Sequence, residues 1–310
     1  MIPTMRFWIA LTILLLAGGN ANLDAANMAD IIKPGTVVQK VAGGFQFTEG
    51  PVWMPGGYLL FSDIPANKIY MLIGGKAEVF REPSGNSNGL TLDRKGRLIA
   101  CEHGDRRVSR TEADGKVTAI AERYQGHRLN SPNDSVVKSD GSVYFTDPPY
   151  GVDAKARELD LQGVYRLSPE GELTLLTKEF DRPNGLAFSP NEKTLYIADS
   201  SNRRHLQAFD VKPDGSLANG RLFAELKSDK PGVPDGLRTD KRGNIYSSGP
   251  GGIWVFTPDG THLCTIATPE VPTNCSWGDA DLKSLYITAQ TSVYRIRCRI
   301  GGSSFPTVQK

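Results

Sequence analysis

The strongest constraint on the fold of this chain is an internal repeat that occurs six times. Each repeat begins with a short polar residue, continues into a short apolar run, and recurs after 39 to 51 residues. One blade of a β-propeller packs four short strands into about 40–45 residues. The repeat therefore predicts an all-β fold, a single six-bladed β-propeller. Its six starting residues are Glu49, Asn88, Asn133, Asn184, Asp235 and Asn274.

Turn signals inside the repeats support four strands per blade. The inner apolar run ends at a turn such as residues 93–96, 138–141 or 240–243, each closing on glycine. A second strand follows, for example at 143–146, and a third carries an aromatic pattern, as at 163–167. Short β-branched and aromatic runs between Asp-Gly and Pro-x-Gly turns are typical of antiparallel hairpins.

The propeller is expected to span residues 36–300. Only 36 residues follow Asn274, so the last blade lacks a strand, and the early run 36–41 is expected to supply it. That pairing would close the ring and remove an exposed sheet edge. Trp53, Trp254 and Trp277 are expected to pack between blades.

Residues 1–25 have the pattern of a secretory signal peptide. Arg6 precedes an apolar run of about 11 residues and a small, polar exit. The run is short for a membrane span, which needs roughly 20 apolar residues, although an uncleaved anchor is the alternative. We therefore expect an exported protein, periplasmic or secreted, with no membrane association after cleavage.

Export leaves two interpretations of the four cysteines, Cys101, Cys264, Cys275 and Cys298. An oxidising compartment permits one or two disulfides, and buried thiols are the other interpretation. Charge argues against a nucleic-acid partner, because 36 basic and 34 acidic residues nearly balance. A monomer or weak dimer is expected.

The repeat predicts a metal-binding channel. Equivalent positions at the start of each innermost strand face the propeller axis, so two carboxylates and four carboxamides would converge there. Such oxygen donors suit Ca²⁺ or Mg²⁺, and two carboxylates would balance one divalent cation. A single Asn-Gly or Asp-Gly pair is more often an ordinary turn. Six in register, including Glu49, favour the channel.

Several longer motifs resemble the gluconolactonase branch of the senescence-marker/gluconolactonase (regucalcin-like) family. The resemblance runs from about Phe47 to Ile296, nearly the whole predicted domain. The motifs that carry it jointly are Thr48-Glu-Gly-Pro, Cys101-Glu-His-Gly, Arg128-Leu-Asn-Ser-Pro-Asn-Asp, Phe145-Thr-Asp-Pro-Pro-Tyr-Gly, Arg182-Pro-Asn-Gly-Leu-Ala-Phe-Ser-Pro and Pro234-Asp-Gly-Leu.

The resemblance implies a calcium-dependent hydrolase that opens sugar lactones. Its metal ligands would be Glu49, Asn133, Asn184 and Asp235, with Mg²⁺, Mn²⁺ or Zn²⁺ as alternative occupants. The cation would act as Lewis acid and Asp235 as general base, an interpretation preferred to Asp235 as nucleophile. Some related propellers hold a second calcium through an acidic residue, but Arg238 stands in that region here.

Five further residues are candidates for substrate binding. Arg128 resembles a family arginine that reaches substrate oxygens, or else is a surface ion-pair partner. Asp134 would bind substrate or orient Asn133. The other candidates are Asn88, His103 and Asn274, with a structural histidine as the alternative for His103. Asp147 and Tyr150 are expected to shape a loop.

Two other functions compete with a sugar lactonase. A calcium-dependent phosphotriesterase, or a lactonase for another ester, could use the same cation on a different substrate. A non-catalytic propeller that binds a carbohydrate or a protein is the candidate from another class.

Overall fold

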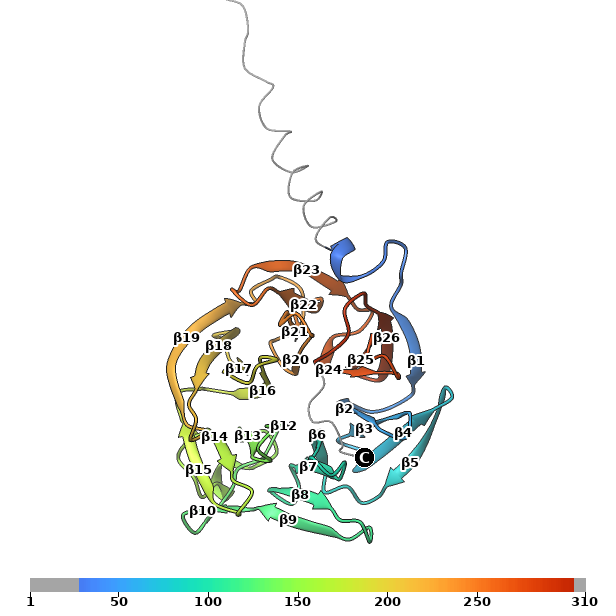
Figure 1. Ribbon diagram of the computed structural model, residues 1–310. Coiled ribbons are helices and arrows are strands. Elements are labelled where there is room, and N and C mark those ends of the chain that lie inside the picture. The colour runs from blue at the N-terminus through green and yellow to red at the C-terminus, as the bar shows by residue number, and fades with distance from the viewer. Residues whose placement is uncertain (1–27, 304–310) are drawn as a thin grey trace, which may run out of the picture.

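Six four-stranded antiparallel sheets surround a central axis in the computed structural model, which describes residues 28–303 (Figure 1). The first sheet consists of β2 (Thr48–Met54), β3 (Tyr58–Asp63), β4 (Lys68–Ile73) and β5 (Lys76–Arg81). The second consists of β6 (Ser87–Leu92), β7 (Leu98–Glu102), β8 (Arg107–Thr111) and β9 (Val117–Ala121). The third consists of β12 (Ser135–Val137), β13 (Val143–Asp147), β14 (Gly163–Leu167) and β15 (Leu173–Thr177). The next two sheets consist of β16 (Pro183–Phe188), β17 (Thr194–Asp199), β18 (His205–Val211) and β19 (Leu217–Glu225); and β20 (Leu237–Thr239), β21 (Ile245–Gly249), β22 (Gly252–Phe256) and β23 (His262–Ala267). The predicted six-bladed propeller is confirmed.

The sixth sheet joins the two ends of the described chain. Strands β24 (Pro272–Gly278), β25 (Ser284–Ala289) and β26 (Ser292–Arg297) are completed on the outside by β1 (Gln39–Gly43). The β1 strand pairs antiparallel with β26. The expected closing strand is therefore confirmed, displaced a few residues from the run 36–41.

Short elements outside the sheets lie next to the third sheet. The hairpin β10 (Arg123–Tyr124) and β11 (His127–Arg128) precedes it, and the single-turn helix η1 (Ala154–Ala156) lies in its β13–β14 connection. None of the helices within residues 28–303 is long and apolar enough to cross a membrane. The predicted signal peptide lies outside the described residues.

The turns form for the reasons that the sequence suggested. Gly96 and Gly243 have φ angles of 74° and 85°, a region that glycine adopts without strain. The Asp93 carboxylate accepts hydrogen bonds from the backbone N–H groups of Lys95 and Arg97, which fixes the β6–β7 turn. Asp240 accepts equivalent bonds in the β20–β21 turn.

The hydrophobic core consists of six clusters, one between each pair of neighbouring blades. Trp53 of the first blade stacks on Tyr286 of the sixth, with ring centroids 5.4 Å apart. Trp277 of the sixth blade meets Tyr246 of the fifth edge to face. All three tryptophans pack between blades as predicted, because Trp254 packs against the cluster between the fourth and fifth blades. The Trp254 ring also stacks on Phe256 of its own blade.

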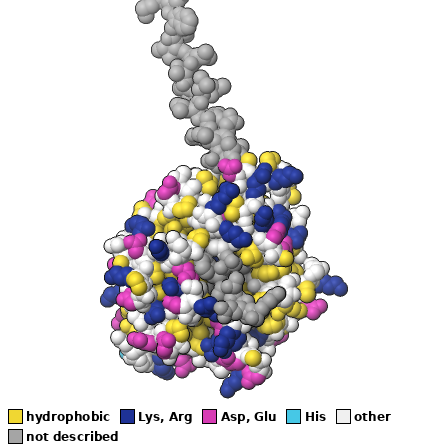
Figure 2. Space-filling view, in the orientation of Figure 1, with side chains coloured by type: hydrophobic (Ala, Val, Ile, Leu, Met, Phe, Trp, Pro, Cys, Tyr) yellow, Lys and Arg dark blue, Asp and Glu magenta, His cyan; other side chains and the backbone are white. Residues whose placement is uncertain are grey.

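All four cysteines lie within the described residues, and none forms a disulfide. Each thiol is buried, and three of them, Cys264, Cys275 and Cys298, belong to the cluster between the fifth and sixth blades. The structure therefore agrees with the interpretation of buried thiols. On the face seen in Figure 2, basic and acidic side chains of the described residues are interspersed.

Candidate active site

The six ring residues lie where the pairing of each innermost strand is interrupted. Register shifts follow Glu49 in β2, flank Asn88 in β6 and Asn184 in β16, and precede Asn274 in β24. Asn133 and Asp235 precede β12 and β20 by two residues. A bulge releases a residue from the ladder and redirects its side chain. The equivalent positions therefore face the axis, as the repeat predicted.

In four of the six repeats a glycine follows the ring residue and allows neighbouring blades to approach at the axis. A Cβ atom on Gly89 would lie 2.6 Å from the carbonyl oxygen of Asn133 in the next blade. One on Gly185 would meet the backbone of Asp235, and one on Gly236 would meet the Asn274 side chain. These glycines are needed for close packing rather than for turns, which answers the turn alternative raised by the sequence.

Three carboxylates converge on the channel from alternate blades, Glu49 from the first, Asp134 from the third and Asp235 from the fifth. The Asn274 amide donates to Glu49 Oε2 at 3.0 Å and to Asp134 Oδ2 at 3.2 Å, so it bridges both groups. Arg238 Nη1 lies 3.6 Å from Asp134 Oδ2. Glu49 and Asp134 are almost completely buried, whereas Asp235 is partly accessible. One arginine thus faces three carboxylates, which leaves two negative charges uncompensated.

Burial and mutual repulsion raise the pKa values of these acids in the metal-free protein. Burial, then the charge of Asp134, raises the pKa of Glu49 to about 8. Burial, then Glu49 and Asp134, raises the pKa of Asp235 well above its usual range. A divalent cation would remove the repulsion and favour both ionised forms.

Amide side chains and a histidine complete the channel. Asn184 Nδ2 donates to Ser200 Oγ at 2.8 Å, and Ser200 Oγ donates to the Pro234 carbonyl. Asn88 Nδ2 lies 3.2 Å from His103 Nε2. Burial lowers the pKa of His103 to about 4, so the imidazole is neutral at pH 7. His103 is thus available for hydrogen bonding to uncharged groups.

A cavity of about 380 Å³ opens above these residues. Its lining includes all four predicted metal ligands and also Asn88 and His103. Asn274 and Asp134 lie close to Glu49 but do not line the cavity. The lining residues are Phe47, Glu49, Ile64, Asn88, His103, Asn133, Tyr150, Arg182, Asn184, Ser200, Val233 and Asp235.

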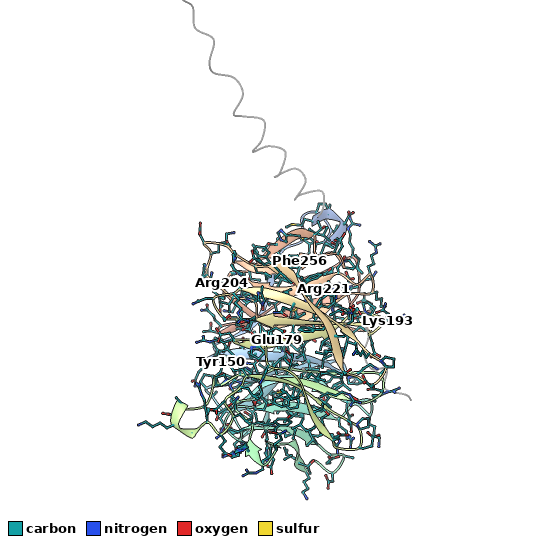
Figure 3. The ribbon with its side chains drawn as sticks, turned by 90° about the vertical axis from the view of Figure 1, so that its left-hand side faces the viewer. Tyr150, Glu179, Lys193, Arg204, Arg221 and Phe256 are labelled. Carbon is teal, nitrogen blue, oxygen red and sulfur yellow. The ribbon has the colours of Figure 1, made fainter. Side chains whose placement is uncertain are left out.

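Two lining residues, Arg182 and Tyr150, were missed as site candidates. The Arg182 guanidinium lies over the Tyr150 ring, 5.9 Å from its centroid. Figure 3 shows Tyr150 at one edge of the molecule and Lys193 at the opposite edge. Strand alternation could have identified Arg182, because positions two before a ring residue share its face. Phe47 and Val233 line the cavity from that same position.

Arg128 and Asp147 lie outside the cavity lining. Arg128 Nη2 donates to the Asp105 carbonyl at 2.9 Å. The Asp147 carboxylate accepts the backbone N–H groups of Asn130 and Ser131 at 2.8 Å, which fixes the loop before Asn133. Asp147 therefore has the architectural role expected of it, whereas Tyr150, from the same motif, reaches the cavity.

The donor set fits a hard divalent cation. Glu49 and Asp235 supply carboxylate oxygens, and Asn133 and Asn184 supply amide oxygens, all on the lining of one cavity. The described part of the chain contains no group of three or more His, Cys, Asp or Glu side chains that could hold a metal.

Comparisons with known proteins agree with this architecture. Residues 47–291 match the family described as the SMP-30/gluconolactonase/LRE-like region. The chain belongs to this family. A gluconolactonase from Zymomonas mobilis is 35% identical over 302 residues, covering 88% of this chain and 84% of the relative.

Solved structures extend the likeness. The solved structure of a gluconolactonase from Xanthomonas campestris has a TM-score of 0.81 and 34% sequence identity to this chain. The match covers 88% of this chain and 92% of that one. A calcium-binding regucalcin from Agrobacterium tumefaciens has a TM-score of 0.75 over 89% of this chain and 98% of that one. At 19% identity it supports the fold alone.

Proposed function

We propose that this protein is a divalent-cation-dependent hydrolase that opens sugar lactones. The observation that carries the proposal is the convergence of Glu49, Asn133, Asn184 and Asp235 on the lining of one cavity. The gluconolactonases among its relatives support the lactone as substrate class. Calcium is the proposed cation, because the donors are oxygen atoms and two negative charges await compensation.

The proposed ligands are Glu49, Asn133, Asn184 and Asp235. When bound, the cation would supply Lewis-acid polarisation of the lactone carbonyl. Glu49 is held by Asn274 and by the Gly50 N–H, so its role is to fix charge and geometry. Asn184 is oriented by Ser200, which in turn is anchored to the Pro234 carbonyl next to Asp235.

Asp235 is the proposed general base. Its carboxylate accepts a proton from water while the water oxygen bonds to the lactone carbonyl carbon. The ring C–O bond then breaks, and the proton passes from Asp235 to the leaving alkoxide oxygen. The products are the hydroxyl group and carboxylic acid of the opened sugar acid. Partial access to the cavity suits Asp235 for this role better than the buried Glu49.

Asn88 and His103 are proposed to bind the hydroxyl groups of the lactone. Both line the cavity, and the neutral imidazole has one donor and one acceptor nitrogen. Asp134 and Asn274 are proposed to hold Glu49 in place and to set the charge below the cavity. Arg128 is proposed as a further substrate contact on its resemblance to the family arginine, although its guanidinium donates to the Asp105 carbonyl in this structure.

The first test is hydrolysis of glucono-1,5-lactone with Ca²⁺ and with chelator, after subtraction of the spontaneous reaction. Asp235→Asn should lower kcat by about 10²–10⁴-fold, the usual contribution of a general base. Asp214→Asn is the matched control, since Asp214 lies in an exposed turn and accepts bonds from Ser216. It should leave kcat unchanged.

The same assay tests the competing functions. Turnover of a phosphotriester but not of any lactone would replace the lactonase by a phosphotriesterase. Calcium-dependent thermal stabilisation without turnover of either substrate would favour a binding propeller. Full activity in chelator would overturn the dependence on a cation.

We also propose that the mature protein acts outside the cytoplasm, as a monomer or weak dimer. The basis is the pattern of residues 1–25. Export followed by N-terminal sequencing tests it, and a mature protein that keeps Met1 would contradict it.

A further inference from the structure

Among residues 28–303, Arg182 is the only arginine or lysine on the lining of the candidate active site. It lies two residues before the ring residue Asn184, at the start of the fourth blade. Its backbone is fixed, because its N–H donates to Asp199 Oδ1 and its carbonyl accepts the N–H of Ser200. The side chain is therefore presented from a rigid base.

The guanidinium of Arg182 has no anionic partner among residues 28–303. No carboxylate forms an ion pair with it, and it donates no hydrogen bond there; its contact is the face of the Tyr150 ring. A guanidinium on an aromatic ring keeps its N–H edge available for a planar anion.

The charges below Arg182 balance without it. With a divalent cation bound, the three carboxylates of Glu49, Asp134 and Asp235 would be matched in charge by Arg238 and the cation. Arg182 then adds one uncompensated positive charge at the rim. A substrate with one negative charge would restore neutrality in a partly desolvated cavity, where such compensation has most effect.

We propose that Arg182 selects lactones that carry a carboxylate remote from the lactone carbonyl, as in lactones of dicarboxylic sugar acids. This inference rests on the proposed lactonase function. The lactone carbonyl lies at the metal-ligand ring, and the remote carboxylate accepts a bidentate pair of hydrogen bonds from Arg182. The volume of about 380 Å³ is at the lower end for small-molecule sites and suits one sugar unit.

The test compares two lactones of equal ring size, D-glucaro-1,4-lactone and D-glucono-1,4-lactone. The glucarolactone carries a carboxylate where the gluconolactone carries a hydroxymethyl group. Arg182→Gln should lower kcat/KM for the glucarolactone about 10–100-fold, the range of hydrogen bonds to a charged group. The value of kcat/KM for the gluconolactone should change less than about threefold. Arg182→Lys should retain part of the preference, because charge persists without the planar fork.

Arg221→Gln is the matched control. Arg221 lies on β19, the outermost strand of the same blade, and pairs with Asp210 at 2.9 Å (Figure 3). Arg221→Gln should leave kcat/KM unchanged for both lactones. Added KCl should lower wild-type kcat/KM for the glucarolactone alone, and Arg182→Gln should remove that dependence. An equal loss for both lactones, or no loss for either, would overturn the proposal.

A binding experiment separates this inference from the lactonase function. Calorimetric titration of the calcium-loaded protein with glucarate and with gluconate requires no turnover. Weaker binding of glucarate, but not of gluconate, in Arg182→Gln supports the role of Arg182 even if no lactone is hydrolysed. An unchanged ratio of the two Kd values would refute it whether or not lactones are substrates.

Discussion

The acidic residues of the channel illustrate how single residues acquire function from their surroundings. Glu49 has a carboxylate like any other in the sequence, but burial and the neighbouring Asp134 favour its protonated form in the metal-free protein. Asn274 bridges the two acids, and Arg238 compensates only part of their charge. These residues stay close together at a free-energy cost that a bound cation would offset.

This cost predicts a pH dependence of stability. Between pH 4.5 and about 8, the native metal-free protein keeps a proton on Glu49 that the unfolded chain has lost. Its free energy of unfolding should therefore fall as pH rises through this window, and be highest below it. Differential scanning calorimetry in chelator should show Tm decreasing from pH 5.5 to pH 8.

Glu49→Gln separates this effect from general acid stability. The amide cannot ionise, so the variant should have a flatter pH profile and, at pH 8 in chelator, a Tm a few degrees above wild type. It should also lose most of the stabilisation by Ca²⁺, which in the wild type should grow with pH as the cation displaces the proton. An identical pH profile in wild type and variant would contradict the assignment.

At the scale of elements, the bulged innermost strands position the site. Four blades interrupt their β-ladder at the ring residue, and in the other two the ring residue precedes the innermost strand by two positions. Innermost strands of adjacent blades contact one another all the way round the ring. The glycine that follows four of the six ring residues makes this approach sterically feasible.

Gly185→Ala tests this packing. The added Cβ would meet the Asp235 backbone, so the fourth and fifth blades must separate. We expect about 1–3 kcal/mol of destabilisation, the usual cost of overpacking, and a smaller Tm increase on adding Ca²⁺. Gly115→Ala is the control, because Gly115 has positive φ with open space around it. It should cost only local strain and leave the response to Ca²⁺ intact.

At the scale of the molecule, the ring is closed by the early strand β1. Its pairing with β26 covers an edge that would otherwise be open, and Val41 and Phe45 pack against the cluster between the sixth and first blades. The closure joins segments about 250 residues apart in sequence, so no single blade is expected to be independently stable.

Truncation before residue 45 should therefore destabilise the whole ring. We expect the thermal transition to fall by more than about 10 °C, or the chain to aggregate through the exposed β26 edge. A chain that begins at Met28 keeps β1 and should unfold at the wild-type Tm. Equal Tm values for the two truncations would show that closure by β1 contributes little.

The repeat alone determined much of this protein. Polar residues in register, with hairpin turns between short strands, specify six blades because each blade obeys the same local rules of alternation and turn chemistry. The ring residues Glu49 to Asn274 could be identified for the same reason. Trp53 and Trp277 could be assigned to blade interfaces because large aromatic residues in strands bury there.

Tertiary structure alone decided the rest. Tyr150 belongs to a loop as the sequence predicts, and the path of this β13–β14 connection brings its ring under Arg182. Arg128 stood close to a ring residue in sequence, yet its short hairpin directs it to Asp105. The convergence of Glu49, Asp134 and Asp235 follows from the circular arrangement of the blades, which brings the starts of the first, third and fifth blades to one axis. Long-range placement of this kind depends on loop paths and ring closure, which a local sequence pattern does not encode.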